Sequence, residues 1–306
     1  YLEWKHSAFA GVRTCQSCHM PEVSGEMAIS SVMGLPREQV SRHVFRGGNF
    51  FMPKVLASER VELGVTALPT ELETMSRRTA DHLGSASARL ATAAQLGADG
   101  LLEIVVTITN LGGHKLPTAY PSRRVWLNLL VRDEDGRVLF ESGRLEPDGS
   151  IVGNDNDAEP ASLEPHYELI DSAAEVQIYE SIMADSHGEI TTVLLSGVRY
   201  AKDNRLLPDG FDKATAGHDI EVHGAAAEDD DFLGGGDTIR YLVEIGDGEG
   251  EIEVEAVLYY QPVAYRWAHN LAQEEAEEIE RFVTAYQEHA SASAVVLARG
   301  TEVVAR

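Results

Sequence analysis

The only two cysteines of the chain stand in one five-residue run, Cys15-Gln16-Ser17-Cys18-His19. The spacing C-x-x-C-H is typical of covalent attachment of a c-type haem. Each thiol forms a thioether bond with a haem vinyl group, and the adjacent histidine binds the iron as its proximal ligand. We therefore predict a haem c bound through Cys15 and Cys18, with His19 as an iron ligand.

Three other uses of the cysteine pair fit this sequence less well. A disulfide across two intervening residues would be strained. A thioredoxin-like redox pair requires a βαβ context that the surrounding sequence lacks. A zinc site would need a second pair of nitrogen or sulfur ligands at ligand spacing. No nucleophile elbow, P-loop or dinucleotide fingerprint occurs in a suitable context either.

The charge of the chain limits its partners. Its 306 residues include 50 acidic and 25 basic side chains, a formal net charge of −25. This charge argues against nucleic acid as a partner. No apolar run approaches the ~20 residues of a membrane span. The chain begins at Tyr1 rather than methionine, so we expect a processed chain or a fragment, and a periplasmic or extracellular location because haem c is attached outside the cytoplasm.

The first part of the chain, residues 1–84, is predicted to be a helical segment that binds the haem. Helices are expected over 35–45, with an early proline and a Gly-Gly stop, over 53–63, and over 69–83.

The sequence of residues 85–268 contains short runs that are typical of β-strands. A strand is expected over 101–109, and two strands over 125–131 and 137–141 are joined by a turn as a hairpin. Further strands are expected over 191–195, 238–245 and 252–260. Short strands separated by turns predict an elaborated immunoglobulin-like β-sandwich, as one domain or two.

Residues 269–306 are expected to contain a helix over 271–289, which has apolar residues at helical spacing and a Glu-rich opposite face, and a terminal strand over 294–298. The predicted fold class is therefore α+β: a small helical haem segment, a β-sandwich and a C-terminal helix.

Several segments resemble bacterial multihaem c-type cytochromes. Tyr1-Leu2-Glu3-Trp4 precedes a C-x-x-C-H-M-P run, as it does in those proteins, and His43-Val44-Phe45 is similar to an H-x-F segment that follows there. Gly113-His114-Lys115-Leu116-Pro117-Thr118, with the following Tyr-Pro-Ser-Arg-Arg, resembles the stretch that opens a β-rich domain in some of them. The stretch 176–213, which includes Lys202-Asp203-Asn204-Arg205, is also similar, without a role that we can assign.

The resemblance implies an electron-transfer cytochrome, with two departures. Phe9 stands where the family often has a histidine ligand, and Ala119 stands where it has glycine. The single haem motif indicates either a one-haem protein or the C-terminal part of a multihaem chain. Redox proteins or neighbouring cytochrome subunits are the expected partners, and a homo-oligomer is compatible with the pattern.

The second axial ligand of the iron is expected to be a histidine or a methionine. His43 is the first choice because it matches the H-x-F segment. His114 is the second, since the neighbouring glycines would let the backbone approach a flat cofactor. His6 and Met52 are further alternatives, and Met20 is a weaker thioether option.

Two other patterns could bind ligands. Arg123 and Arg124 could pair with a haem propionate through bidentate hydrogen bonds. Residues 154–159, Asn-Asp-Asn-Asp-Ala-Glu, offer the hard oxygen ligands that calcium prefers, although without EF-hand spacing, so that a solvated acidic turn is the simpler interpretation.

The expected function is single-electron transfer outside the cytoplasm, rather than enzymatic catalysis. One alternative is a reductase of small nitrogen or sulfur compounds with an open iron site. Another is a structural cytochrome subunit whose β-domain assembles multi-subunit or filamentous electron conduits.

Overall fold

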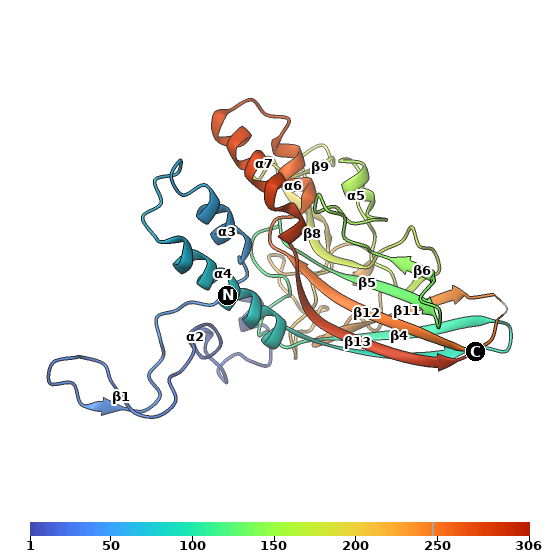
Figure 1. Cartoon of the computed structure of the whole chain (residues 1–306), viewed down its shortest axis with the longest axis horizontal. Coiled ribbons are helices and arrows are strands. Elements are labelled where there is room, and N and C mark those ends of the chain that lie inside the picture. The colour runs from blue at the N-terminus through green and yellow to red at the C-terminus, as the bar shows by residue number, and fades with distance from the viewer. Residues whose placement is uncertain (247) are drawn as a thin grey trace.

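The computed structural model describes residues 1–246 and 248–306. Two β-sheets form the body of the molecule, and several helices gather at one end of them (Figure 1). The N-terminal segment extends outward from this helical end. The predicted α+β class, with large sheets and a C-terminal helix, is confirmed.

The larger sheet has seven strands, in the order β10-β8-β5-β12-β13, with β6 paired to β5 and β9 paired to β8. Its strands are β5 (Arg124–Asp133), β6 (Val138–Ser142), β8 (Ile178–Ala184), β9 (Ile190–Thr191), β10 (Arg199–Asp203), β12 (Glu251–Gln261) and β13 (Val295–Ala305). All of its pairings are antiparallel. The expected hairpin over 125–141 is present as β5 and β6.

The smaller sheet has four strands, in the order β3-β4-β11-β7. These are β3 (Ala88–Leu96), β4 (Leu101–Asn110), β7 (Leu169–Ile170) and β11 (Gly236–Glu244). Strand β7 runs parallel to β11, and the other pairings are antiparallel.

One apolar core lies between the two sheets. Successive side chains of a strand point to opposite faces, so every second residue enters the core. The buried residues of β4 and β5 show this alternation: Leu102, Ile104, Val106 and Ile108, and Val125, Leu127, Leu129 and Val131. The opposite face of β5 is covered as well, because Trp126 packs there with Ile151, Val176 and Ile178.

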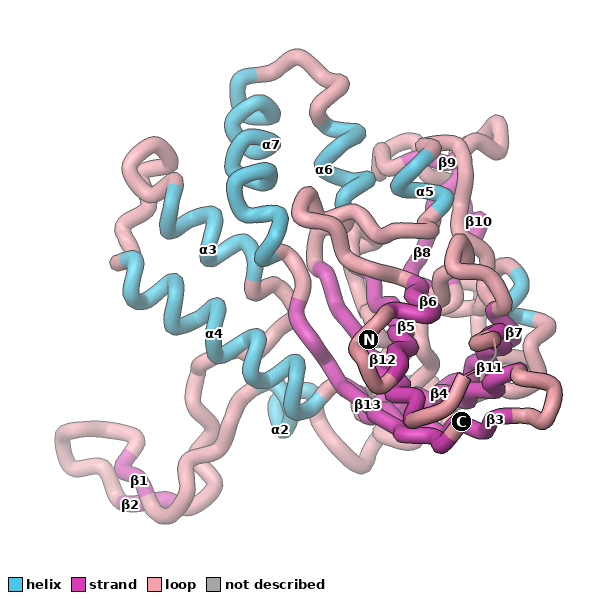
Figure 2. The backbone as a smooth tube through the Cα atoms, turned by 45° about the vertical axis from the view of Figure 1, so that its right-hand side comes forward, coloured by secondary structure: helices cyan, strands magenta, loops and turns pink. Residues whose placement is uncertain are grey.

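Helices α3 (Phe51–Ser58), α4 (Pro69–Ala86) and α7 (Glu277–His289) lie together beside the sheets (Figure 2). The N–H of Leu68 donates to the carboxylate of Glu71 at 2.8 Å and so caps the start of α4 at the predicted proline. The rings of Phe51 and Tyr286 meet edge to face, with centroids 5.6 Å apart, and join α3 to α7. Three shorter helical turns, α5 (Asp155–Ala158) and two 3-10 turns (Ala225–Ala227 and Ala290–Ala292), lie in connections. Within the described residues, no helix is long and apolar enough to cross a membrane.

The N-terminal segment, residues 1–50, has little regular structure. It contains the short helices α1 (Leu2–Lys5) and α2 (Cys15–His19) and a two-stranded ribbon of β1 (Met27–Ala28) and β2 (Pro36–Arg37). Glu3 and Phe50 are its only buried residues. The segment therefore has no apolar core of its own.

The helix predicted over 35–45 is wrong. Apart from the two residues of β2, this stretch is irregular, and none of its side chains is buried. A helix of this length is marginal in water unless one face packs against the protein. No such packing is available here, because the stretch lies in the outward-projecting part of the segment.

Other boundaries also differ from the sequence predictions, and the helix expected over 53–63 is α3, which ends at Ser58. The strand expected over 191–195 is only β9, because Ser196 and Gly197 donate to the carbonyl of Val193 and close a turn. The helix expected from 271 begins at Glu277, where three glutamates occupy the first turn and interact favourably with the helix dipole. Helix α6 (Tyr265–Leu271) precedes it. The terminal strand extends to Ala305 because β12 provides a full-length partner.

Two long strands were missed. The Ala-rich sequence of β3 favours a helix by propensity, but pairing with β4 over nine residues makes it a strand. Strand β8 contains Glu180 and Ser181 among its apolar residues and is buried along its whole length, so its sequence does not alternate.

Candidate haem site

The two cysteines lie on one exposed helical turn. The hydroxyl of Thr14 accepts a bond from the N–H of Ser17 at 3.4 Å and caps the start of α2. Cys15 and Cys18 are three residues apart and so project from neighbouring positions on the helix surface. Both thiols are free and exposed. They are accessible for attachment to a flat cofactor lying against this turn.

His19 is held by one ring nitrogen, which leaves the other available to a metal. Its Nδ1 lies 2.5 Å from the carbonyl oxygen of Arg46, and since a carbonyl only accepts, Nδ1 carries the proton. The N–H of Arg46 donates in return to the carbonyl of His19 at 2.9 Å. The lone pair of His19 therefore resides on Nε2, as a metal ligand requires.

His114 has the same arrangement on the sandwich side. Its Nδ1 donates to the carbonyl of Lys115 at 2.9 Å, and its own carbonyl accepts from the side chain of Asn110 at 2.9 Å. A Cβ at Gly113 would lie 3.2 Å from both Phe9 and Trp4, so glycine lets this turn approach the N-terminal segment. Burial lowers the pKa of His114, which favours the neutral imidazole that binds metals.

The rings of His19 and His114 lie near each other and are almost parallel. Their centroids are 6.1 Å apart and their planes differ by 13°. This separation lies toward the long end of the range of about 4.5–7 Å that offset-stacked rings span. Two metal–imidazole bonds of about 2 Å in line, together with the distance from each nitrogen to its ring centre, span about 6 Å. With both Nδ1 atoms bonded to carbonyls, the pair fits a metal-centred cofactor between the two rings.

The other predicted ligands have different neighbours. His43 is exposed beside Phe45, with ring centroids 6.4 Å apart. The Nε2 of His6 lies 3.0 Å from the carbonyl of Asp212. Met52 packs against the core from α3, and Met20 directly follows α2. Among the described residues, the predicted ligand whose ring pairs with that of His19 is the second choice, His114.

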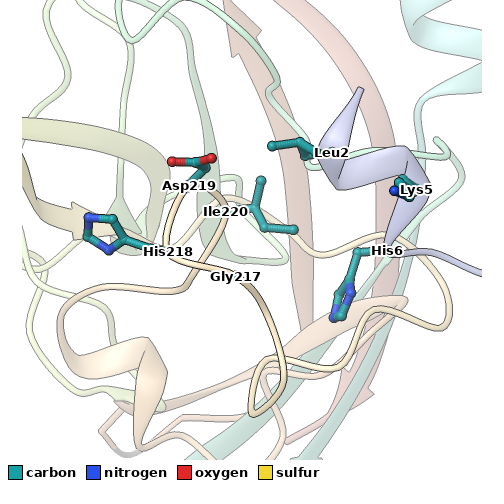
Figure 3. Close-up of a pocket in the computed structure, with 7 residues that line it drawn as sticks. All are labelled: Leu2, Lys5, His6, Gly217, His218, Asp219 and Ile220. Atoms are coloured by element: carbon teal, nitrogen blue, oxygen red, sulfur yellow. The ribbon is translucent and has the colours of Figure 1, made fainter.

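His6 lines a surface pocket of about 360 Å³. Leu2 and Lys5 of α1 form one wall of this pocket, and residues 217–220 form the other (Figure 3). The ring of His6 stands edge-on to Phe211, with centroids 4.8 Å apart. Since neither His19 nor His114 lines this pocket, it is separate from the paired imidazoles.

One histidine near His19 was not singled out from the sequence. His82 is half-buried on α4, and its pKa is lowered by burial and by the neighbouring charges of Arg46 and His19. Only tertiary packing brings α4 next to the haem motif. A histidine in the middle of a helix carries no spacing signal that would have identified it.

The two predicted arginines differ in their surroundings. Arg124 is buried, and its Nη1 lies 2.9 Å from both carboxylate oxygens of Asp157, so it is not available to a propionate. Arg123 is only partly buried and donates to the carbonyl of Thr118 at 3.0 Å. Only Arg123 remains a candidate for pairing with a carboxylate of a bound cofactor.

The acidic stretch 154–159 does not form a calcium cage. It contains the single turn α5, whose N-terminus is capped by Asn154. The carboxylate of Asp157 is occupied by Arg124 and by the N–H of Ile151. Nothing in the structure supports the calcium prediction, because the central carboxylate already neutralises a buried cation.

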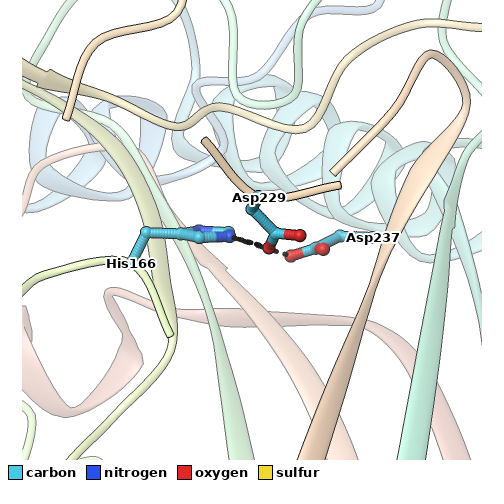
Figure 4. Close-up of side chains that lie close together, drawn as sticks. All are labelled: His166, Asp229 and Asp237. Atoms are coloured by element: carbon cyan, nitrogen blue, oxygen red, sulfur yellow. Dashed lines mark hydrogen bonds and ion pairs between the residues drawn. The ribbon is translucent and has the colours of Figure 1, made fainter. Parts of the chain in front are cut away.

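A different cluster has the composition of a metal site. His166, Asp229 and Asp237 are all buried, with ligand atoms within 4.8 Å of one another (Figure 4). The Nε2 of His166 lies 2.9 Å from Asp229, and the hydroxyl of Tyr179 donates to Asp237 at 2.7 Å.

The hydrogen bonds of His166 argue against a metal in this cluster. Its Nδ1 accepts from the amides of Gln177 and Asn204, at 2.8 and 3.1 Å. Both amides are oriented by backbone N–H groups, from Tyr167 and Glu180, that donate to their oxygens. The proton of His166 must therefore be on Nε2, where it donates to Asp229 and blocks the nitrogen that would face the metal. We interpret the cluster as a closed hydrogen-bond network.

Comparison with known proteins gives one fold-level likeness. No family model and no curated protein matches the sequence. Among solved structures, a penta-heme cytochrome c552 from Thermochromatium tepidum is similar, with a TM-score of 0.52 and 15% sequence identity over 99% of this chain. The chain spans 49% of the length of that cytochrome. At this identity the likeness shows a shared fold, that of a multihaem cytochrome.

Proposed function

We propose that this chain is an extracytoplasmic electron-transfer cytochrome, or a segment of a multihaem one. Cys15 and Cys18 would hold the haem covalently, and His19 and His114 would be its two axial ligands. The observation that carries the proposal is the pair of nearly parallel imidazoles, 6.1 Å apart, next to a C-x-x-C-H turn.

A haem with two imidazole ligands takes up and releases single electrons. The chain's own contribution is to hold both ligands still. The carbonyls of Arg46 and Lys115 fix the orientation of the two rings and keep each Nε2 unprotonated. Since neither ring needs to move or to change its proton, the ligands favour transfer of electrons over binding of a substrate.

The likeness to a penta-heme cytochrome supports partners of the same kind. We propose redox proteins or neighbouring cytochrome subunits as electron donors and acceptors. We also propose a periplasmic or extracellular location, since covalent haem attachment takes place outside the cytoplasm. The formal charge of −25 favours partners with basic docking surfaces.

The test is a pyridine haemochrome assay with visible spectra of the protein matured with haem-attachment machinery. We expect one covalent haem per chain and a low-spin spectrum. His114→Ala should convert it completely to high spin, because the iron loses one strong ligand. His43→Ala is the matched control and should leave the spectrum unchanged.

Two outcomes would contradict parts of this proposal. A high-spin wild-type protein would revive the alternative of an open, catalytic iron site. A change to high spin in His43→Ala, but not in His114→Ala, would make His43 the distal ligand. A chain without covalent haem would overturn the proposal as a whole.

A further inference from the structure

A buried carboxylate reaches the loop that carries His114 from the opposite end of the sequence. Glu3, on α1, is 8% exposed. Its Oε2 accepts from the N–H of Lys115 at 3.1 Å and from the hydroxyl of Thr118 at 2.7 Å. The residue directly after His114 is thus held by Glu3, and its carbonyl holds the ring of His114.

Glu3 belongs to a closed network of four charged side chains. Its Oε1 accepts from Arg205 at 2.9 Å. Arg205 in turn makes two bonds to Asp203, at 2.9 and 2.6 Å, and the ammonium of Lys115 donates to Asp203 at 3.0 Å. Two carboxylates and two cations therefore balance one another beside the distal histidine.

The network is buried, so its charges act over a longer range than surface charges do. Lys115 and Asp203 are at most 1% exposed. Burial alone would raise the pKa of Asp203, but Arg205 and Lys115 together hold it below its usual range. Such pairs are screened little by salt, and each unbalanced charge would be felt at the neighbouring site.

The network also joins three segments that the sequence analysis quoted for their resemblance to multihaem cytochromes. Glu3 comes from the Tyr-Leu-Glu-Trp run, Lys115 and Thr118 come from the His-Lys-Leu-Pro-Thr run, and Asp203 and Arg205 come from Lys-Asp-Asn-Arg. All three meet behind His114. We therefore consider the three segments together as one network that acts on His114.

We propose that Glu3 is a positioning residue for the distal ligand and that the charge balance between Glu3 and Arg205 sets the reduction potential of the haem. The inference rests on the proposed function, since it requires a haem between His19 and His114. The ferric form carries one more positive charge than the ferrous form. A negative charge beside His114 therefore stabilises the ferric state, and a positive one stabilises the ferrous state.

The test measures the midpoint potential of the haem-loaded protein in two variants, one that lacks a negative charge of the network and one that lacks a positive charge. Glu3→Gln removes a negative charge at nearly constant shape and should shift the equilibrium toward the ferrous form about tenfold, which is 59 mV for one electron. Arg205→Gln removes a positive charge and should shift it in the opposite direction. Glu22→Gln, the same change at an exposed site of the same segment, is the matched control and should shift it less than about twofold.

Shifts of the midpoint potential in opposite directions, with low-spin spectra retained, would support the inference. A merely structural role would not make the two variants shift the potential in opposite directions. Equal potentials in all variants, or shifts in the same direction for Glu3→Gln and Arg205→Gln, would overturn it. If Glu3→Gln fails to fold, the direction of the Arg205→Gln shift decides. A wild-type protein without low-spin haem is a separate result, which contradicts the proposed function instead.

Discussion

The N-terminal segment and the β-sandwich are stabilised in different ways. The sandwich buries alternate residues of two sheets in a continuous apolar core, whereas residues 1–50 bury only Glu3 and Phe50. Large apolar side chains such as Ile29, Met33 and Leu35 are exposed in the segment. A segment with so little apolar burial cannot offset the entropy of ordering its chain. The sandwich is thus stabilised by its own apolar packing, and we expect the proposed cofactor to contribute to the order of residues 1–50.

The two regions differ in charge as well. Residues 1–50 contain five basic and four acidic side chains, and the rest of the chain contains 20 basic and 46 acidic ones. The large negative charge therefore belongs to the sandwich and the helices beside it. Residues 1–50 are nearly neutral, so we expect docking of a partner at this segment to depend less on charge than the net value of the chain suggests.

The largest expected effect is a loss of order in residues 1–50 while the sandwich stays folded. Replacing Cys15 and Cys18 together by serine should abolish covalent haem, because no thiol remains to form a thioether. Without the cofactor, proteolysis within residues 1–50 should accelerate about tenfold, since cleavage follows local opening. Limited proteolysis with mass spectrometry measures this rate.

Gln16→Ala is the control for this experiment, because Gln16 is exposed between the two cysteines and forms no side-chain hydrogen bond within the described residues. It should retain the haem and the wild-type cleavage rate. Equal cleavage of the double-serine and wild-type chains would show that the segment is ordered by its own contacts.

A smaller effect is expected when a leucine is shortened in each of the two regions and the free energies of unfolding are compared. Leu127→Ala removes a fully buried side chain of β5 and should lower the free energy of unfolding by about 2–5 kcal/mol, through lost burial and a residual cavity. Leu35→Ala makes the same change at a side chain that is 81% exposed. It should change the free energy of unfolding by less than about 0.5 kcal/mol. Urea unfolding followed by circular dichroism compares them. Similar losses for both variants would mean that the segment contributes packing that the structure does not show.

The effect that is smallest per pH unit concerns the buried polar network of the sandwich and its pH dependence. Burial raises the pKa of Asp237 to about 7, and burial lowers the pKa of His166 to about 4. Between about pH 4 and 7 the folded chain keeps a proton on Asp237 that the unfolded chain releases, so this residue makes stability fall as the pH rises. His166 has the opposite effect between about pH 4 and 6.5, because there only the unfolded chain is protonated.

Asp237→Asn should therefore remove the contribution of Asp237 and keep that of His166. Relative to the wild type, the free energy of unfolding of the variant should rise by about 1.4 kcal/mol per pH unit between about pH 4 and 7. Urea unfolding at several pH values measures this slope, and Asp230→Asn, at an exposed neighbouring carboxylate, is the control. Parallel stability curves for Asp237→Asn and the wild type would show that Asp237 titrates normally in the folded chain.

Features that depend on near neighbours in the chain could be predicted from the sequence alone. The spacing of Cys15, Cys18 and His19 lies within one helical turn, so the haem prediction needed no knowledge of the fold. The alternation of β4 and the turn between β5 and β6 are also local, because each strand's period and each turn's residues are written in consecutive positions.

The contacts between residues far apart in the chain depend on the tertiary structure. His114 faces His19 because the Gly112-Gly113 turn packs against α1, and Glu3 reaches Arg205 across 202 residues of sequence. The helix expected over 35–45 failed for the same reason, since its formation depends on a packing partner that the fold does not provide. Local patterns fix period and motif, but the pairing of side chains far apart in the chain follows from how the sheets and the N-terminal segment come together.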